Sequence, residues 1–92
     1  MKTRDEMMTT IEEKYPKLFM RTTEEFNGSK NGIWSSAENN DVAKDGLKLF
    51  DYYTENQTKY ELGVHQEITN ILAKNGWFAE WYDVGTIMFW KE

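Results

Sequence analysis

The chain has 92 residues, is 39% hydrophobic and 15% aromatic, and carries a formal net charge of −5. This length allows one domain over residues 1–92, and the aromatic content excludes an intrinsically disordered chain. The absence of a basic stripe, of cysteine and of any long apolar run argues against direct nucleic-acid binding, disulfides and membrane insertion, so we expect a cytoplasmic protein.

The first predicted element is a helix over residues 3–14. Its apolar residues recur at helical spacing: Met7, Met8, Ile11 and Tyr15. Thr3 and Glu6 have the spacing of a capping box. Pro16 has no backbone N–H and disfavours the helical conformation at the residue before it, so the helix should end there.

A second helix is predicted to begin at Pro16, which suits the first helical turn. Phe19, Thr22 and Phe26 would lie along one side of it. Residues 27–46 follow, with two Asn-Gly pairs and an Asp-Gly pair that indicate turns. Within this stretch Ile33-Trp34 is expected to form a short strand or a hydrophobic plug. The aromatic-rich run Leu47–Tyr53 favours a strand.

The strongest helical pattern lies in the last third of the chain. Four apolar residues fall within about 100° of one another on a helical wheel: Val64, Ile68, Ile71 and Leu72. Polar or small residues lie opposite: Gln66, Asn70, Ala73 and Lys74. The helix should begin near Gly63 and end at Asn75-Gly76, because Gly76 readily adopts the left-handed conformation that terminates helices.

A tryptophan-rich β-hairpin is predicted next, with strands at 77–82 and 87–91. A two- or four-residue loop pairs Trp81 with Met88 and gives one uniformly apolar face: Trp77, Ala79, Trp81, Met88 and Trp90. The other face is mixed: Phe78, Glu80, Tyr82, Ile87, Phe89 and Lys91. A three-residue loop would put Trp90 beside Glu80, so we expect the segregated register. The predicted fold class is therefore α+β: N-terminal helices, a short antiparallel sheet, one amphipathic helix and the C-terminal hairpin.

The mixed face of the hairpin has two interpretations. The N-terminal helices could cover it as a second layer, or it could remain exposed as a partner surface, since tryptophan and tyrosine dominate interaction hot spots. The candidate partner-binding residues are Trp34, Tyr52, Tyr53, Phe78, Glu80, Tyr82 and Phe89. A homodimer through the hairpin would also cover such a face.

Few residues suggest catalysis. His65 is the only histidine, and its place beside the apolar stripe favours a half-buried structural role over general acid–base chemistry. Asp83 is explained as a turn former and Glu80 as a solvent-facing strand residue. A single histidine without cysteine makes a zinc site improbable, so no metal or cofactor is expected.

Two parts of the chain resemble a known group of proteins. The segments 11–19 (IEEKYPKLF), 45–53 (DGLKLFDYY), 63–65 (GVH) and 75–88 (NGWFAEWYDVGTIM) are similar to patterns in small uncharacterised tailed-phage and prophage proteins. The resemblance implies a phage or mobile-element origin, and with it the cytoplasm of a bacterial host. That family has no assigned catalytic residues, so none is transferred. Small acidic phage accessory proteins of this size often resemble inhibitors of host enzymes or defence complexes, anti-CRISPR proteins among them.

The leading hypothesis is a non-enzymatic phage protein that inhibits a host or defence-system protein by occupying a surface. Its acidic charge would steer it toward a basic, nucleic-acid-binding surface of that partner. One alternative is a module that binds or sequesters a small ligand such as a nucleotide signal. A second alternative is a small enzyme that uses His65 with Asp51 or Asp83.

Overall fold

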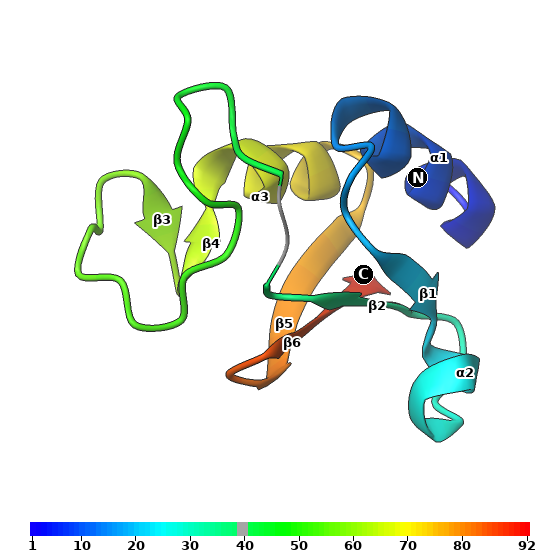
Figure 1. Cartoon of the computed structure of the whole chain (residues 1–92). Helices are drawn as coiled ribbons and strands as arrows, with labels where there is room; N and C mark the ends of the chain where they lie inside the picture. Colours follow the sequence, from blue (N-terminus) through cyan, green and yellow to red (C-terminus); the bar gives the residue numbers. More distant parts are fainter. Residues whose placement is uncertain (39–40) are drawn as a thin grey trace.

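The computed structural model describes residues 1–38 and 41–92, and in these ranges the chain has an α+β fold, as predicted (Figure 1). The helices are α1 (Arg4–Lys14), α2 (Thr23–Asn27) and α3 (Gln66–Lys74). The strands are β1 (Met20–Thr22), β2 (Ile33–Ser36), β3 (Tyr60–Glu61), β4 (Val64–His65), β5 (Trp77–Asp83) and β6 (Thr86–Lys91). An antiparallel sheet has the order β1-β2-β6-β5, and β3 with β4 forms a separate small hairpin.

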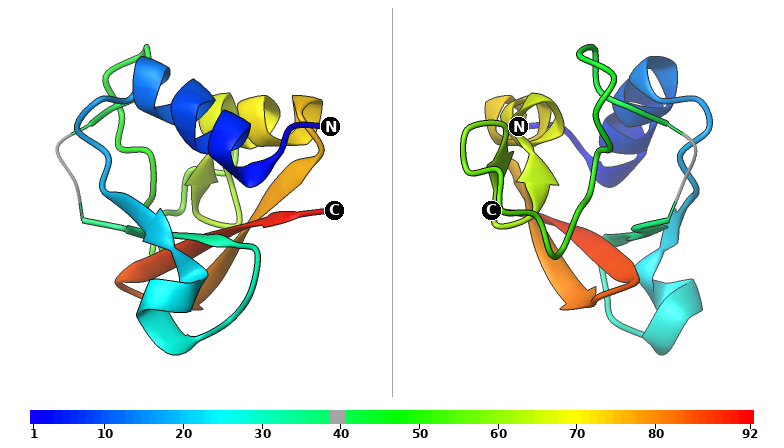
Figure 2. Two further views of the ribbon diagram at one scale, coloured as in Figure 1. Left: turned by 90° about the vertical axis from the view of Figure 1, so that its right-hand side faces the viewer. Right: turned by 60° about the vertical axis from the view of Figure 1, so that its left-hand side comes forward.

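Helices α1 and α3 both lie over one face of the sheet, and the hydrophobic core fills the space between (Figure 2). The helices contribute Met7, Ile11, Ile68 and Leu72 to it, and the sheet contributes Ile33, Trp77, Ile87 and Phe89. All of these side chains are nearly inaccessible to water. The short helix α2 lies on the opposite side of the sheet from α1 and α3.

The prediction for the first helix is confirmed at both of its ends. The Thr3 hydroxyl accepts a hydrogen bond from the backbone N–H of Glu6, whose carboxylate in turn accepts from the N–H of Thr3. The helix ends at Tyr15, just before Pro16. Both signals act on adjacent residues only, so they determine the ends of the helix whatever the rest of the chain does.

The predicted second helix from Pro16 is wrong. Met20–Thr22 instead forms strand β1 and pairs with β2, and the helix that follows is α2, only five residues long. A second capping box, formed by Thr22 and Glu25, begins α2. Ile33-Trp34 lies in a strand, as expected, and this strand is the pairing partner that makes residues 20–22 extended. Two of the residues in the stretch 27–46, residues 39–40, lie outside the described part of the chain.

The predicted strand over Leu47–Tyr53 is also wrong. Only single bridges form, Val42 with Lys48 and Phe50 with Val64. The N–H of His65 donates to the carbonyl of Leu49, and the N–H of Asp51 donates to that of Gly63, both at 2.8 Å. A turn closed by Thr54 and Asp51 then ends the pairing, so this segment packs against β4 as a loop.

The amphipathic helix is confirmed, although α3 begins three residues later than Gly63. Ile68 and Leu72 point into the core, and the residues predicted opposite them are exposed: Gln66, Asn70, Ala73 and Lys74. Val64 is buried from β4 rather than from the helix. Gly76 ends the segment with φ 81°, the left-handed conformation expected of it.

The C-terminal hairpin is confirmed, but its predicted register is wrong by one residue. Trp81 pairs with Ile87 and Asp83 with Thr86, so Tyr82 is an extra residue that forms a bulge before the turn. The bulge moves each β6 side chain to the face opposite the predicted one. Ile87 and Phe89 therefore face the core, and Met88 and Trp90 join the face of Phe78 and Glu80.

Candidate functional site

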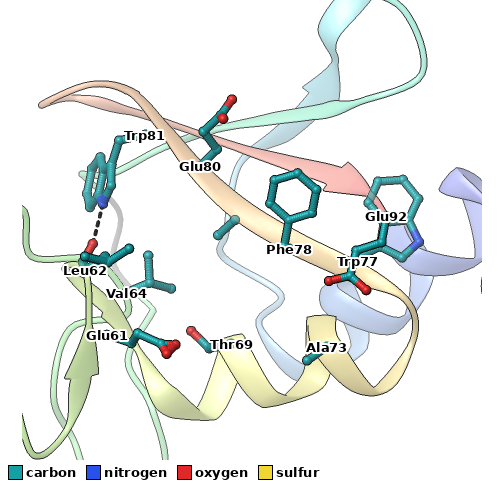
Figure 3. Close-up of a pocket in the computed structure, with 11 residues that line it drawn as sticks. Glu61, Leu62, Val64, Thr69, Ala73, Trp77, Phe78, Glu80, Trp81 and Glu92 are labelled. Carbon is teal, nitrogen blue, oxygen red and sulfur yellow. Dashed lines mark hydrogen bonds between the residues drawn. The ribbon is translucent and has the colours of Figure 1, made fainter.

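An elongated groove of about 470 Å³ runs between β5 and the elements beside it (Figure 3). We call it the β5 groove. Its lining residues are Glu61, Leu62, Val64, Thr69, Ala73, Trp77, Phe78, Ala79, Glu80, Trp81 and Glu92. Most of the exposed lining is apolar, and three of these eleven described residues are glutamates while none is basic. The site thus combines an apolar floor with a negative potential.

Trp81 closes one end of the β5 groove. Its indole N–H donates a 2.7 Å hydrogen bond to the carbonyl of Leu62, which connects β5 to the β3–β4 turn. On the opposite wall Thr69 and Ala73 of α3 point toward the strand. The hydrogen bond fixes the β3–β4 turn against β5 at this end of the groove.

Leu62 is the least expected residue of this site. It occupies the first position of the two-residue turn between β3 and β4, with φ 50°, and Gly63 follows with φ 77°. Such turns favour asparagine and glycine, because the left-handed conformation costs other residues roughly 1–2 kcal/mol. The Leu62 side chain is also 84% exposed. An apolar side chain is therefore presented to solvent at the edge of the β5 groove, in a conformation that stability alone would not select.

Tyr52 and Tyr53 extend the aromatic surface beyond Trp81. The ring of Tyr52 packs edge-on against Trp81 with centroids 5.1 Å apart, and against Tyr53 at the same distance. Tyr52 is 50% exposed and Tyr53 is 77% exposed. Trp81, Tyr52 and Tyr53, which we call the tyrosine ridge, form a strip that begins at the half-buried Trp81 beside the groove and ends at the two exposed tyrosines.

A second group of aromatics lies on the outer face of the sheet. Trp34 is flanked by Phe19 and Phe26 with ring centroids 4.9 and 4.8 Å away, and Phe26 also contacts Tyr82. Helix α2 carries Phe26, so α2 covers part of this face. Phe78 and Tyr82 remain 40% and 54% exposed. The first helix does not provide the second layer considered in the sequence analysis, because α1 packs on the other face.

His65 has a structural environment. Its Nδ1 accepts a hydrogen bond from the backbone N–H of Glu67, which caps α3, and its Nε2 lies 3.0 Å from a carboxylate oxygen of Asp45. The backbone N–H of Leu47 and the His65 ring together hold the pKa of Asp45 below its ordinary value. Both ring nitrogens are thus engaged, and the side chain is buried. Asp51 and Asp83, its suggested catalytic partners, form no hydrogen bond to it.

The neighbouring pair Tyr15 and Glu67 ties α1 to α3. The Tyr15 hydroxyl donates to the Glu67 carboxylate at 2.5 Å. Burial, together with this carboxylate, raises the pKa of Tyr15, so the hydroxyl keeps its proton. Partial burial opposes ionisation of Glu67, but hydrogen bonds from Tyr15 and from the backbone N–H of Lys44 prevail and lower its pKa. The cluster therefore acts as a connection between elements.

Replacing His65 by alanine is expected to lower the free energy of unfolding by about 2 kcal/mol, because the cap of α3 and the bond to Asp45 are both lost. His65→Asn should recover about half of this loss, since an asparagine oxygen can cap a helix. Gln66→Ala, at an exposed position of the same helix, is the matched control and should change little. Urea unfolding measures all three, and a His65→Ala variant as stable as the parent would contradict the capping role.

The described part of the chain, residues 1–38 and 41–92, has neither a cluster of potential metal ligands nor a helix long and apolar enough to cross a membrane. Comparison of the chain with known protein families, curated proteins and solved structures finds no match.

The residues predicted to bind a partner fall into separate locations. Tyr52 and Tyr53 lie on the tyrosine ridge, Phe78 and Glu80 line the β5 groove, and Trp34 and Tyr82 belong to the outer aromatic group. Phe89 does not belong with them: it is 0% exposed, because the bulge turns it into the core. Leu62 and Trp81 were not among the candidate residues predicted from the sequence. For Leu62, its position directly before Gly63 could have indicated an exposed apolar residue in a short turn.

Proposed function

We propose that this chain is a small acidic binding protein that inhibits a bacterial host or defence-system protein by covering a surface of it. The proposal joins the resemblance to phage accessory proteins with the chemistry of the exposed side chains. Acidic proteins associate fastest with basic surfaces, and the basic surfaces of nucleic-acid-processing enzymes are typical targets. We propose a role without catalysis, because both nitrogens of the only histidine are engaged in structural hydrogen bonds.

The tyrosine ridge is the observation that carries this proposal. Tyrosine and tryptophan supply large rigid contact areas with few rotatable bonds and are enriched where binding energy concentrates. Here Tyr52 and Tyr53 are largely exposed, and Trp81 links them to an apolar groove with glutamates at its rim. An exposed apolar strip with an acidic border fits a basic protein surface with apolar residues at its centre.

The alternative of a nucleotide-binding module has less support. The β5 groove contains three glutamates and no basic residue among its described lining, so it would repel phosphate groups. A second hollow beside Tyr52 and Tyr53 is also mainly acidic, since three of its charged lining residues are Glu38, Asp41 and Asp51 and the fourth is Lys48. A tight small ligand at a hundred times its dissociation constant would add about 2.7 kcal/mol to the stability, which a thermal-shift screen would detect.

Affinity purification of the tagged chain from its bacterial host, followed by mass spectrometry, tests the proposed function. We expect one protein in about equimolar amount, and we expect Tyr52→Ala with Tyr53→Ala to weaken the complex at least tenfold. Val42→Ala, which is similarly exposed but lies outside the tyrosine ridge, is the control and should bind normally. The complex should also inhibit the activity of the recovered protein. Failure of the folded chain to retain any stoichiometric protein would count against the proposal.

A further inference from the structure

The β5 groove follows the free edge of a β-sheet. Five consecutive residues, 77–81, line it. Successive side chains of a strand point to opposite faces, so a groove that touches all five must run along the strand edge, where the backbone lies. Strand β5 is the last in the order β1-β2-β6-β5, so this edge has no neighbouring strand within the described chain.

The pairing pattern shows which backbone groups face the groove. The N–H of Glu92 donates to the carbonyl of Gly76 at 2.9 Å, so these opposed residues form a hydrogen-bonded pair. Such pairs alternate along an antiparallel ladder, which makes Phe78 the next residue of β5 bonded to β6. The N–H and carbonyl groups of Trp77, Ala79 and Trp81 therefore point away from β6, but Trp77 is only 1% exposed, so those of Ala79 and Trp81 are the ones that a partner can reach. No backbone bond to them occurs among the described residues outside the sheet ladders.

The negative charge around this edge favours the approach of a positively charged segment. Glu61 lies on the opposite wall of the β5 groove, Glu80 on the strand and Glu92 at the end of the groove, and no described lining residue is positive. Between these glutamates the lining is apolar, and it includes Val64 and Ala73 on the side of the groove opposite β5. A complementary segment would therefore carry lysine or arginine together with apolar residues.

A second copy of this chain fits the edge poorly. Full antiparallel pairing of two β5 strands would centre on Glu80 and place its two carboxylates directly opposite each other, which is destabilising. It would also bring the groove's glutamates on both copies together, at a net charge of −5 per chain. The edge is thus protected against self-association by the same charges that would attract a basic segment.

We propose that the free edge of β5 binds an extended basic segment of a partner protein, which adds to the sheet as a further strand beside Ala79 and Trp81. Backbone hydrogen bonds to the edge supply affinity, and the glutamates and apolar residues of the β5 groove supply specificity. Leu62 contacts the apolar side chains of the added strand from the turn above it. This proposal rests on the proposed function, because it describes how the chain recognises its protein partner.

A titration of the isotope-labelled full chain with a seven-residue peptide of alternating lysine and valine tests the proposal. We expect the amide hydrogens of Ala79 and Trp81 to exchange at least tenfold more slowly in the complex. Affinity should fall about tenfold between low and high salt, because the charged contacts are partly exposed. The same peptide N-methylated at alternate residues keeps its charge but cannot pair, and it should bind at least tenfold more weakly.

A matched pair of variants separates pairing from charge. Ala79→Pro removes an outward N–H without removing a bond to β6 and should abolish peptide binding, whereas Glu80→Lys should weaken it and reduce its salt dependence. Equal affinity for the plain and N-methylated peptides would overturn the proposal. Absence of binding would also overturn it. Slow exchange of the Ala79 and Trp81 amides that depends on protein concentration in the absence of peptide would do the same, since it identifies a second copy as the occupant.

The outcomes for the edge and for the inhibitory function are distinguishable. If a host partner is captured and its binding depends on Tyr52 and Tyr53 but survives Ala79→Pro, the proposed function stands and the edge proposal fails. If the peptide binds at Ala79 and Trp81 but the host supplies no partner, the edge site stands and the inhibitory function fails.

Discussion

Replacing Phe89 by alanine is expected to lower the free energy of unfolding by about 3–5 kcal/mol, among the largest effects of any single substitution in this chain. The ring is fully buried between the sheet and the helices and packs against Phe50 at a centroid distance of 6.1 Å. Its removal leaves a cavity that the flanking strands β2 and β5 cannot close. Equilibrium urea unfolding, monitored by tryptophan fluorescence, measures the loss.

Phe78→Ala is the matched control for this prediction. It removes the same side chain from the same hairpin, but Phe78 lies on the outer face and is 40% exposed, so the expected loss is about 1 kcal/mol. The difference between the two variants reports the register directly. If Phe78→Ala destabilised the protein more than Phe89→Ala, the bulge at Tyr82 and the face assignment of β6 would both be wrong.

Replacing Gly63 by alanine is expected to cost about 2–4 kcal/mol. Gly63 has φ 77°, where an alanine is strained, and an added Cβ would lie 2.9 Å from the carbonyl oxygen of Asp51 and 3.2 Å from the Cα of Tyr52. Both are backbone atoms, so the loop that carries the tyrosine ridge must shift. Faster hydrogen exchange of the Asp51 amide, which bonds to the Gly63 carbonyl, should accompany the loss of stability.

Gly46→Ala isolates the conformational part of that effect. Gly46 has φ 84° but nothing within 4 Å of its added Cβ, so only the strain of about 1 kcal/mol is expected. The excess for Gly63→Ala then measures the contact with the 51–52 backbone. If the proposed function is right, Gly63→Ala also weakens partner binding through displacement of Tyr52 and Tyr53, while Gly46→Ala does not. Equal losses of stability for both variants would contradict the close contact.

Leu62 is unfavourable for stability both in its backbone conformation and in its exposure. A leucine in the left-handed conformation and largely exposed is unfavourable for an isolated domain, and natural proteins retain such features mainly where function requires them. Trp81 holds the carbonyl of this residue, so the turn is fixed against the sheet. The exposed side chain and the edge of β5 thus form one surface built from elements far apart in the sequence.

The amino-acid sequence by itself determined the features whose partners lie within a few residues. Thr3 with Glu6 begins α1, Pro16 ends it, and Gly76 ends α3, because each signal acts through hydrogen bonds or backbone sterics of the adjacent turn. The core face of α3 was equally predictable, since Ile68 and Leu72 recur at the helical period. The existence of the C-terminal hairpin and the α+β class follow from such local patterns.

Only the tertiary structure decided what depends on distant partners. Residues 20–22 become a strand because β2 lies beside them, and the run Leu47–Tyr53 remains a loop because β4 offers it a single bridge. One extra residue at Tyr82 reverses the faces of β6 and buries Phe89, and no pattern within the hairpin distinguishes that register from its alternative. The β5 groove and the tyrosine ridge arise in the same way, because the 49–53 loop, the β3–β4 turn, α3 and β5 meet only when the chain folds.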